Sequence, residues 1–526
     1  MALISTTAIT TVICFVLLCL LRDAGYGGPH HDEVIGLLAA GAKEGSFAKM
    51  LAEENPPLNH VVNAAEWHRF THFERAVSFS EIRWDVMHGD KHPPLAFWLM
   101  NLWSRLFSSA GYSEVVWLIQ LQVILAALIL GGTVWRYTHC RHSALLAFSI
   151  FLFGNSAVFT SIWVRQYGLF VVCYAALVAV SGELVRQRIP KLQNALLLLT
   201  LAVVCLAGMM TQYTFVTMSL PIHVMLLGVL LLQKNWPQFF RVVTGYASAG
   251  IVFFLLMPGV IKHASEVSSG QKLESQWMGA VSGISKMVIP LPSSLPAWLF
   301  VLAGAGCLLF PLVLAAIACR PGRRTMDDTR PDVRIPLAGM LGAGMLQFVM
   351  VAVGLFPGWA TGENHMCAFW LLTVLAAVLC LHKFQLRRLK QGLIGVTLCV
   401  MLGMQALFTW HCHRILPRVN TSYIQSQPHD LVVIDELARG FVLQITDLVP
   451  AEEKVLATDS KQLASRFEDG SLTAYHKILY LPMDGTVREG KAFVIAAAER
   501  SGWTVLELPV VHTGMYEAFL FSQSTE

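Results

Sequence analysis

Long apolar runs separated by short polar segments occupy most of the first 410 positions of the chain. Many of these runs approach the roughly 20 residues that a helix needs to cross a bilayer. The shorter apolar segment 94–108 opens with two prolines, which suit the first turn of a helix, so we expect it to lie on the membrane surface as a juxtamembrane helix. The pattern predicts about eleven transmembrane helices, at 3–21, 114–135, 143–163, 166–185, 192–211, 214–233, 242–259, 296–319, 335–355, 366–382 and 392–410.

The last part of the chain has the composition of a soluble domain, in which strand-like and helix-like segments alternate. This alternation predicts a small, mostly parallel sheet. The expected strands are "DLVVID", "KVLATD", "KILYLP", "WTVLELPV" and "YEAFLFSQ", and the expected helices are "ELARGFVLQITDLV", "SKQLASRF" and "EGKAFVIAAAERSG". The sequence therefore predicts a transmembrane domain at 1–410, with a long outer loop at 22–113, and a soluble C-terminal α/β domain at 411–526.

The composition agrees with a polytopic α-helical membrane protein. Of the 526 residues, 55% are hydrophobic and 14% are charged, whereas a soluble protein carries about 25% charged residues. No Lys or Arg precedes the first apolar segment and no clear cleavage site follows it, which favours an uncleaved first helix over a signal peptide. The 11 cysteines show no CxxC spacing, so neither a zinc site nor a disulfide framework is indicated.

The basic residues predict which side of the membrane each loop occupies. Because cytoplasmic loops carry an excess of Lys and Arg, the basic loops are expected to be cytoplasmic. This places the loop 22–113, the loop near 260–295 and the C-terminal domain on the outer side. The basic loops lie near 136–141, 186–191, 234–241, 320–334 and 383–390.

An acidic pair, Asp32 and Glu33, follows the first membrane helix in the segment "HDEV". A carboxylate there could act as a base or bind a metal, and partial burial would raise its pKa and make it a better proton acceptor. The alternative is an ordinary first turn of a surface helix, where acidic residues are favoured. Spacing alone leaves both interpretations open.

A second polar segment, "HGDKH", directly precedes the two prolines of the juxtamembrane helix. Asp90, Lys91 and His92 lie ahead of a helix N-terminus, where Lys and His could bind a phosphate. The apolar residues that follow, including Trp98 and Trp103, suit the membrane interface. A simple interfacial anchor helix is the alternative.

Three further polar positions are expected on the outer side. Arg165 interrupts an apolar stretch, and a lone arginine at membrane depth usually has an anionic partner, such as a lipid phosphate or Asp32. The alternative for Arg165 is a turn residue that extends towards water. Glu363 and His365 in "GENHMCAF" could bind a sugar, a metal or an acceptor, or could cap the next helix. Tyr213 marks another outer turn.

These motifs together resemble the GT-C superfamily of membrane glycosyltransferases, in particular the bacterial branch related to protein O-mannosyltransferases and lipid A aminoarabinose transferases. In that group, an acidic pair ends the first helix, a D-x-H-P-P-L stretch opens a juxtamembrane helix, and R-x-Y follows the third helix. This chain carries "HDE" at 31–33, "DKHPPLAFWLMNLW" at 90–103 and "RQY" at 165–167, in that order. The resemblance covers about the first 230 residues, and "ENHMCAF" departs from the Arg-Tyr pair that many members carry there.

The resemblance implies roles for the motif residues of this chain. Asp32 would be the catalytic carboxylate, with Glu33 in support. Asp90 and His92 would line the same cavity, and Lys91 or His92 would face the donor phosphate. Arg165 would stabilise the leaving phosphate, with Tyr167 beside it.

The function that the resemblance implies is transfer of a sugar from a polyprenyl-phosphate donor to a glycan, lipid or protein acceptor. Direct attack on the anomeric carbon predicts inversion. We expect the chain in a bacterial inner membrane, with its active site on the periplasmic side and no nucleic-acid partner. Asp32, Asp90 and His92 could also bind a divalent metal such as Mg or Mn.

Two other functions stay open. A lipid or glycan transporter would favour polar residues through the bilayer centre, whereas the polar residues of this chain cluster at one surface. A non-catalytic subunit of an envelope assembly complex would also fit the C-terminal α/β domain.

Overall fold

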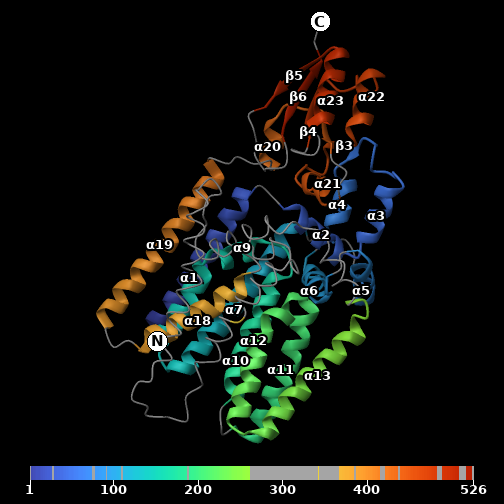
Figure 1. The fold of residues 1–526 in the computed structure, drawn as a ribbon. Helices are drawn as coiled ribbons and strands as arrows, with labels where there is room; N and C mark the ends of the chain where they lie inside the picture. The colour runs from blue at the N-terminus through green and yellow to red at the C-terminus, as the bar shows by residue number, and fades with distance from the viewer. Residues whose placement is uncertain are drawn as a thin grey trace. The chain divides into compact units, whose positions relative to one another are not determined.

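The computed structural model shown in Figure 1 forms two compact units, described in turn below. The first unit comprises Met1–Cys19, Lys91–Ala96 and Trp117–Leu407, and the second comprises Leu20–Asp90, Phe97–Val116 and Phe408–Glu526. The structure describes residues 2–26, 29–73, 77–89, 92–107, 111–185, 189–260, 342, 366–383, 387–414, 421–435, 439–482, 488–508 and 517–523.

The membrane helices confirm a polytopic membrane protein. Within the described residues, six helices are long and apolar enough to cross a bilayer, or seven if the bent pair α8 and α9 counts as one span. The predicted helices 296–319 and 335–355 lie outside the described residues, apart from Gly342, so the total of eleven stays a prediction. The six are α1 (Ala2–Tyr26), α7 (Tyr112–Thr138), α10 (Tyr167–Leu184), α11 (Lys191–Thr211), α12 (Thr214–Leu232) and α13 (Trp236–Leu256).

The helix expected at 143–163 is two helices, α8 (Arg141–Phe153) and α9 (Asn155–Ile162), which meet at an angle of 60°. Gly154 separates them because the indole of Trp370, on α18 (Cys367–Lys383), occupies the space that a side chain would need. Trp370 Nε1 donates to the Phe151 carbonyl at 3.1 Å. The same carbonyl also accepts from the Gly154 amide at 3.2 Å, so both bonds meet at the end of α8.

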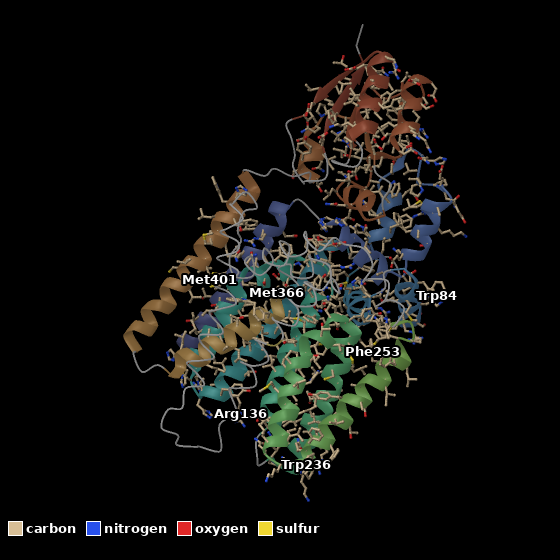
Figure 2. The ribbon with its side chains drawn as sticks, in the orientation of Figure 1. Trp84, Arg136, Trp236, Phe253, Met366 and Met401 are labelled. Carbon is tan, nitrogen blue, oxygen red and sulfur yellow. The ribbon has the colours of Figure 1, made fainter. Side chains whose placement is uncertain are left out.

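Polar and aromatic side chains mark the ends of the membrane helices in the first unit. Arg136, in the last turn of α7, donates to the Glu183 carboxylate of α10 at 2.9 Å. Trp236 begins α13, and Phe253 lies near the other end of the same helix (Figure 2). α10 itself is apolar and buried along most of its length, as expected for a helix surrounded by others.

The second unit contains a six-stranded sheet with the order β1-β3-β2-β4-β6-β5. The five strands predicted in the C-terminal segment are confirmed, but the sheet is mixed rather than mostly parallel, because only β3, β2 and β4 run parallel. The strands are β1 (Val62–Asn63), β2 (Leu431–Asp435), β3 (Lys454–Ala457), β4 (Lys477–Pro482), β5 (Trp503–Glu507) and β6 (Phe519–Gln523).

The two faces of this sheet are covered by different parts of the chain. Alternate strand residues point to opposite faces. On one face, Leu431 and Val433 pack with side chains of α22 (Ser460–Glu468) and α23 (Arg488–Arg500). On the other face, Val432 and Ile434 pack with α21 (Arg439–Thr446) and with helices from the first outer loop.

The first outer loop is therefore part of the same folded unit as the C-terminal segment. Its edge strand β1 pairs with β3, and Thr71 donates to the Asp447 carboxylate at 2.6 Å. The remaining short helices are α2 (His31–Ala40), α3 (Glu44–Ala52), α4 (Ala65–Thr71), α5 (Phe79–His88), α6 (Leu95–Ser104) and α20 (Thr421–Ser426), while α19 spans Arg387–Arg414. At ten residues, α6 is shorter than a membrane span.

Candidate functional site

The acidic pair lies in the first turn of α2, which a reciprocal capping arrangement fixes. His30 is the N-cap residue, and its Nδ1 accepts a hydrogen bond from the Asp32 amide at 3.3 Å. In return, Glu33 Oε2 accepts from the His30 amide at 2.6 Å. Such a capping box pairs two backbone donors that the start of a helix leaves without partners. Val34 and Leu38 then bury α2 against the core of the second unit.

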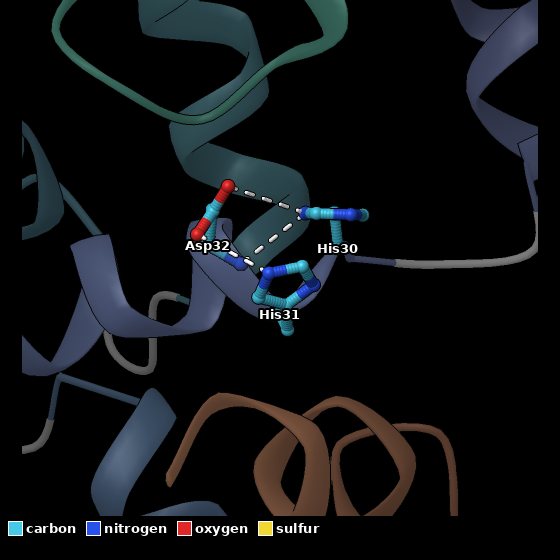
Figure 3. Close-up of side chains that lie close together, drawn as sticks. All are labelled: His30, His31 and Asp32. Carbon is cyan, nitrogen blue, oxygen red and sulfur yellow. Dashed lines mark hydrogen bonds and ion pairs between the residues drawn. The ribbon is translucent and has the colours of Figure 1, made fainter. Parts of the chain in front are cut away.

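The two carboxylates of this turn differ sharply in exposure. Glu33 is only 2% exposed, whereas the side chain of Asp32 is 47% exposed. Asp32 Oδ1 lies 3.4 Å from His31 Nε2, and Asp32 Oδ2 lies 3.7 Å from His30 Nδ1 (Figure 3). Asp32 is therefore open to an incoming group and flanked by two imidazoles.

The same three side chains have the donor set of a metal site. Among the described residues, His30, His31 and Asp32 form the one group whose ligand atoms all lie within 4.8 Å of one another. Ligands of a tetrahedral zinc ion are separated by about 3.3 Å, close to the 3.4 Å between His31 Nε2 and Asp32 Oδ1. Imidazole nitrogens favour a transition metal over Mg. The sequence prediction of Asp32 as a metal candidate fits this group, to which His92 does not belong.

Two further residues of the second unit, Tyr112 and Asp23, form a hydrogen bond that the sequence did not predict. Tyr112, the first residue of α7, donates its hydroxyl proton to Asp23 Oδ1 at 2.6 Å. Asp23 is 89 positions away from Tyr112 in the sequence, so no local pattern connects them. The one local feature that could have indicated Asp23 is its place as an acidic residue directly after the first apolar run.

Arg165 belongs to the first unit and lies in the turn between α9 and α10. Its side chain is 6% exposed, so it is buried within that unit rather than extended towards water. Tyr167, also 6% exposed, begins α10 directly after it. A guanidinium buried at this depth is usually paired with an anionic group.

The other predicted residues are placed as follows. Tyr213 precedes α12, and its ring packs edge-on against Phe253 of α13 at 6.3 Å. His92 is half-buried and precedes the buried prolines that lead into α6. Asp90, Lys91, Glu363 and His365 lie outside the described residues.

The predicted site residues thus fall into two groups. Asp32 and Glu33 lie in the second unit, whereas His92, Arg165, Tyr167 and Tyr213 lie in the first. That the two groups share one pocket stays a prediction.

Comparison with known proteins finds similarity only among solved structures. No protein-family model and no curated protein sequence matches the chain. ArnT from Cupriavidus metallidurans bound to undecaprenyl phosphate is 10% identical, with 98% of each chain covered and a TM-score of 0.37. The oligosaccharyltransferase AglB from Archaeoglobus fulgidus, in complex with an inhibitory peptide and a dolichol-phosphate, is 11% identical. The match covers 98% of this chain and 74% of AglB, with a TM-score of 0.42.

ArnT and AglB are GT-C membrane glycosyltransferases, the superfamily that the sequence motifs resemble, and the similarity extends across nearly the full chain. A second Archaeoglobus fulgidus oligosaccharyltransferase structure, tethered with an acceptor peptide, is 8% identical, with 95% of this chain and 69% of that chain covered and a TM-score of 0.42. Matches with such identities and TM-scores do not establish a shared activity, so a functional assignment has to rest on the residues of this chain.

Proposed function

We propose that this protein transfers a sugar from a polyprenyl-phosphate donor to an acceptor hydroxyl at the outer face of a bacterial inner membrane. The observation that carries the proposal is the exposed Asp32 carboxylate, which lies in a fixed helical turn shortly after the first membrane helix. Undecaprenyl phosphate and dolichol-phosphate, bound in the ArnT and AglB structures, belong to the chemical class of the proposed leaving group.

In the proposed reaction, the acceptor oxygen attacks the anomeric carbon while Asp32 takes the proton from the acceptor hydroxyl. A new glycosidic C–O bond forms, and the bond between the anomeric carbon and the phosphate oxygen breaks. The bonding electrons leave with the polyprenyl phosphate, so the configuration inverts. General-base catalysis of this kind contributes about 100- to 10,000-fold in rate.

Cationic side chains would stabilise the charge that grows on the leaving phosphate. Arg165 is the proposed main contributor, with Lys91 or His92 and with Tyr167 beside it. Buried cations are effective here because electrostatic interactions are stronger where water is excluded. Asp90, Tyr213, Glu363 and His365 are the further residues proposed to contact the donor or the acceptor, which could be a glycan, a lipid or a protein.

A divalent metal could take part in charge neutralisation. His30, His31 and Asp32 would hold such an ion, and when bound it would offset negative charge at the reacting phosphate. The partial positive charge of the α2 N-terminus opposes cation binding at this position, so Asp32 as proton acceptor is the main proposal.

The test is transfer of a labelled sugar from a polyprenyl-phosphate donor by the purified full-length protein in lipid nanodiscs. We expect Asp32→Asn to lower the turnover by about 100- to 10,000-fold while leaving the folded fraction unchanged. Glu499→Gln, which neutralises an exposed carboxylate on α23, is the matched control and should turn over normally. Normal turnover by Asp32→Asn would remove the mechanism, and label that only changes leaflet without transfer would indicate a transporter.

A further inference from the structure

A groove lies between three membrane helices of the first unit, near the turn that joins α7 to α8. Its volume is about 410 Å³, within the range of about 300–1,000 Å³ that is typical of ligand sites. α7 and α8 form its walls, and Ala8 of α1 also lines it. None of the residues assigned to the proposed sugar transfer lines this groove, so it is a separate feature of the molecule.

The two walls of the groove carry the same pattern of residues. In both helices the lining positions follow the spacing i, i+3, i+4 and i+7, which places side chains on one face of a helix. Each wall is therefore one helix face that extends over two turns. The lining residues are Leu128, Gly131, Gly132 and Trp135 of α7, and Arg141, Ala144, Leu145 and Phe148 of α8.

Small residues create the space between these walls. A Cβ on Gly131 would lie 3.3 Å from the Ala144 carbonyl oxygen, so the two helix backbones approach closely there. A Cβ on Gly132 would meet no described atom within 4 Å outside its own helix backbone, so the space beside it is open. The hydroxyls of Thr11 and Ser149 lie 3.3 Å apart and hold α1 against α8.

The groove has a polar end and an apolar end. Arg141 is the first residue of α8, and Trp135 lies in the last turn of α7. Phe148 and Leu128 lie seven residues deeper in the same two helices, which corresponds to about 10 Å along a helix. Trp135 is 49% exposed and Leu128 is 56% exposed. A molecule in the groove would therefore contact a cation and an indole at the membrane surface and apolar side chains below them.

The charge at the polar end favours an anion. The Arg141 side chain is exposed and forms no ion pair or hydrogen bond with the residues that the structure describes. Arg136, one turn away, differs because it donates to the Glu183 carboxylate at 2.9 Å, which offsets its charge. The N-cap side chain of Cys140 makes no capping bond to the first amides of α8. The helix N-terminus therefore adds partial positive charge beside Arg141.

The surroundings restrict the occupant to a lipid, because an open apolar groove on a membrane helix faces acyl chains rather than water. Basic pockets between transmembrane helices on the cytoplasmic side bind anionic lipid headgroups, and the basic loops predict that this end of α7 is cytoplasmic. We propose that the groove binds one anionic phospholipid, with its phosphate at Arg141 and an acyl chain along Gly132 towards Leu128. This inference does not depend on the proposed sugar transfer.

The experiment measures lipid binding to the delipidated full-length protein by native mass spectrometry. Phosphatidylglycerol, which is anionic, and phosphatidylethanolamine, which is zwitterionic, are titrated separately and carry the same acyl chains. We expect one phosphatidylglycerol to bind about fivefold more tightly than phosphatidylethanolamine, because a net negative charge lies beside a basic side chain.

Two variants test the two parts of the groove. Arg141→Gln removes the cation and should abolish the preference for phosphatidylglycerol, whereas Arg241→Gln, at an exposed position of α13 outside the groove, should keep it. Gly132→Leu fills the groove and should weaken phosphatidylglycerol binding about tenfold. Gly228→Leu on α12 is its matched control, because its Cβ also has open space, and it should bind as the wild type does.

Thermal unfolding of each variant checks that the fold is retained, which the higher helix propensity of leucine over glycine favours. If Gly132→Leu does not fold, the comparison of Arg141→Gln with Arg241→Gln decides. Equal affinity of the wild type for the two lipids would indicate ordinary boundary lipid and would overturn the inference. A preference that survives in Arg141→Gln, or that Arg241→Gln abolishes equally, would also overturn it. Unchanged binding by a folded Gly132→Leu protein would place the lipid elsewhere, and displacement of phosphatidylglycerol by an equimolar polyprenyl phosphate would rule out a phospholipid as the occupant.

Discussion

Replacing Gly154 by alanine should destabilise the membrane part of the protein, because the new methyl group would meet the indole of Trp370. A Cβ on Gly154 would lie 2.0 Å from Trp370 Nε1 and 2.4 Å from Cε2. The neighbour is a bulky ring rather than the flexible end of a long side chain. The backbone at Gly154, with φ −67° and ψ 142°, tolerates any L-residue, so the substitution tests packing and not backbone strain.

The expected loss of stability follows from the packing and the hydrogen bond of the Trp370 ring. Trp370 is 5% exposed and donates to the Phe151 carbonyl at 3.1 Å, so it has little room to move and a hydrogen bond to lose. Forcing an extra methyl group into a packed core and losing one buried hydrogen bond together cost about 2–4 kcal/mol. The Gln405 amide, which donates to the Phe153 carbonyl at 3.2 Å, holds the same bend and limits relaxation.

Reversible unfolding in mixed micelles measures this loss. Gly228→Ala on α12 is the matched control, because no atom lies within 4 Å of its added Cβ, and it should change stability by less than about 0.5 kcal/mol. Combining Gly154→Ala with Trp370→Phe should cost less than the sum of the two single changes, because the smaller ring leaves room for the methyl group. Strictly additive losses, or a Gly154→Ala protein as stable as the wild type, would refute this packing account of the bend.

Three further predictions concern the second unit. Asp447→Ala removes the acceptor of the Thr71 hydroxyl, so it should cost about 1–3 kcal/mol and speed proteolysis of the first outer loop, whereas equal proteolysis rates would contradict the contact. Hydrogen bonds from Ser78 hold the pKa of Glu81 below its usual value. This capping box therefore stabilises α5 fully at pH values above the usual pKa of a glutamate. The stabilisation is lost as the pH falls through the lowered pKa of Glu81. The protection factors of the amides in the first turn of α5, which correct for the pH dependence of intrinsic exchange, should therefore fall in acid, but not in Glu81→Gln. Because the α2 N-terminus opposes cation binding, elemental analysis after zinc addition should find equal zinc in the wild type and His31→Ala, whereas zinc lost in His31→Ala would make the His30–Asp32 cluster a metal site.

Local patterns sufficed for the elements whose cause is local. A membrane helix needs only a long enough apolar run, so α10, α11 and α12 begin and end within two residues of their predicted bounds. The five C-terminal strands were equally readable, because each is a short apolar run between polar turns. The mixed strand order could not be predicted from the sequence, because the antiparallel pairing of β6 with β4 and β5 depends on tertiary contacts.

Structural features that depend on contacts between distant parts of the sequence could not be predicted from local patterns. The break between α8 and α9 depends on Trp370, which lies more than 200 positions downstream of the Phe151 carbonyl that it binds. Strand β1 is two residues long and carries no alternation, so nothing local marked it as the edge of a sheet. The contact between Tyr112 and Asp23 belongs to the same class, and it was found only from the fold.

The acidic pair shows how structure adds to a motif. Their spacing alone does not distinguish Asp32 from Glu33, and in the sequence only the family resemblance assigns catalysis to Asp32. In the structure, Glu33 is buried and its Oε2 accepts from the His30 amide, whereas Asp32 is half exposed between two imidazoles. Two carboxylates in different environments can take different roles. A general base has to reach its substrate. Of this pair only the exposed Asp32 can do so. The proposed mechanism therefore assigns the proton transfer to Asp32 and the support of the helical turn to Glu33.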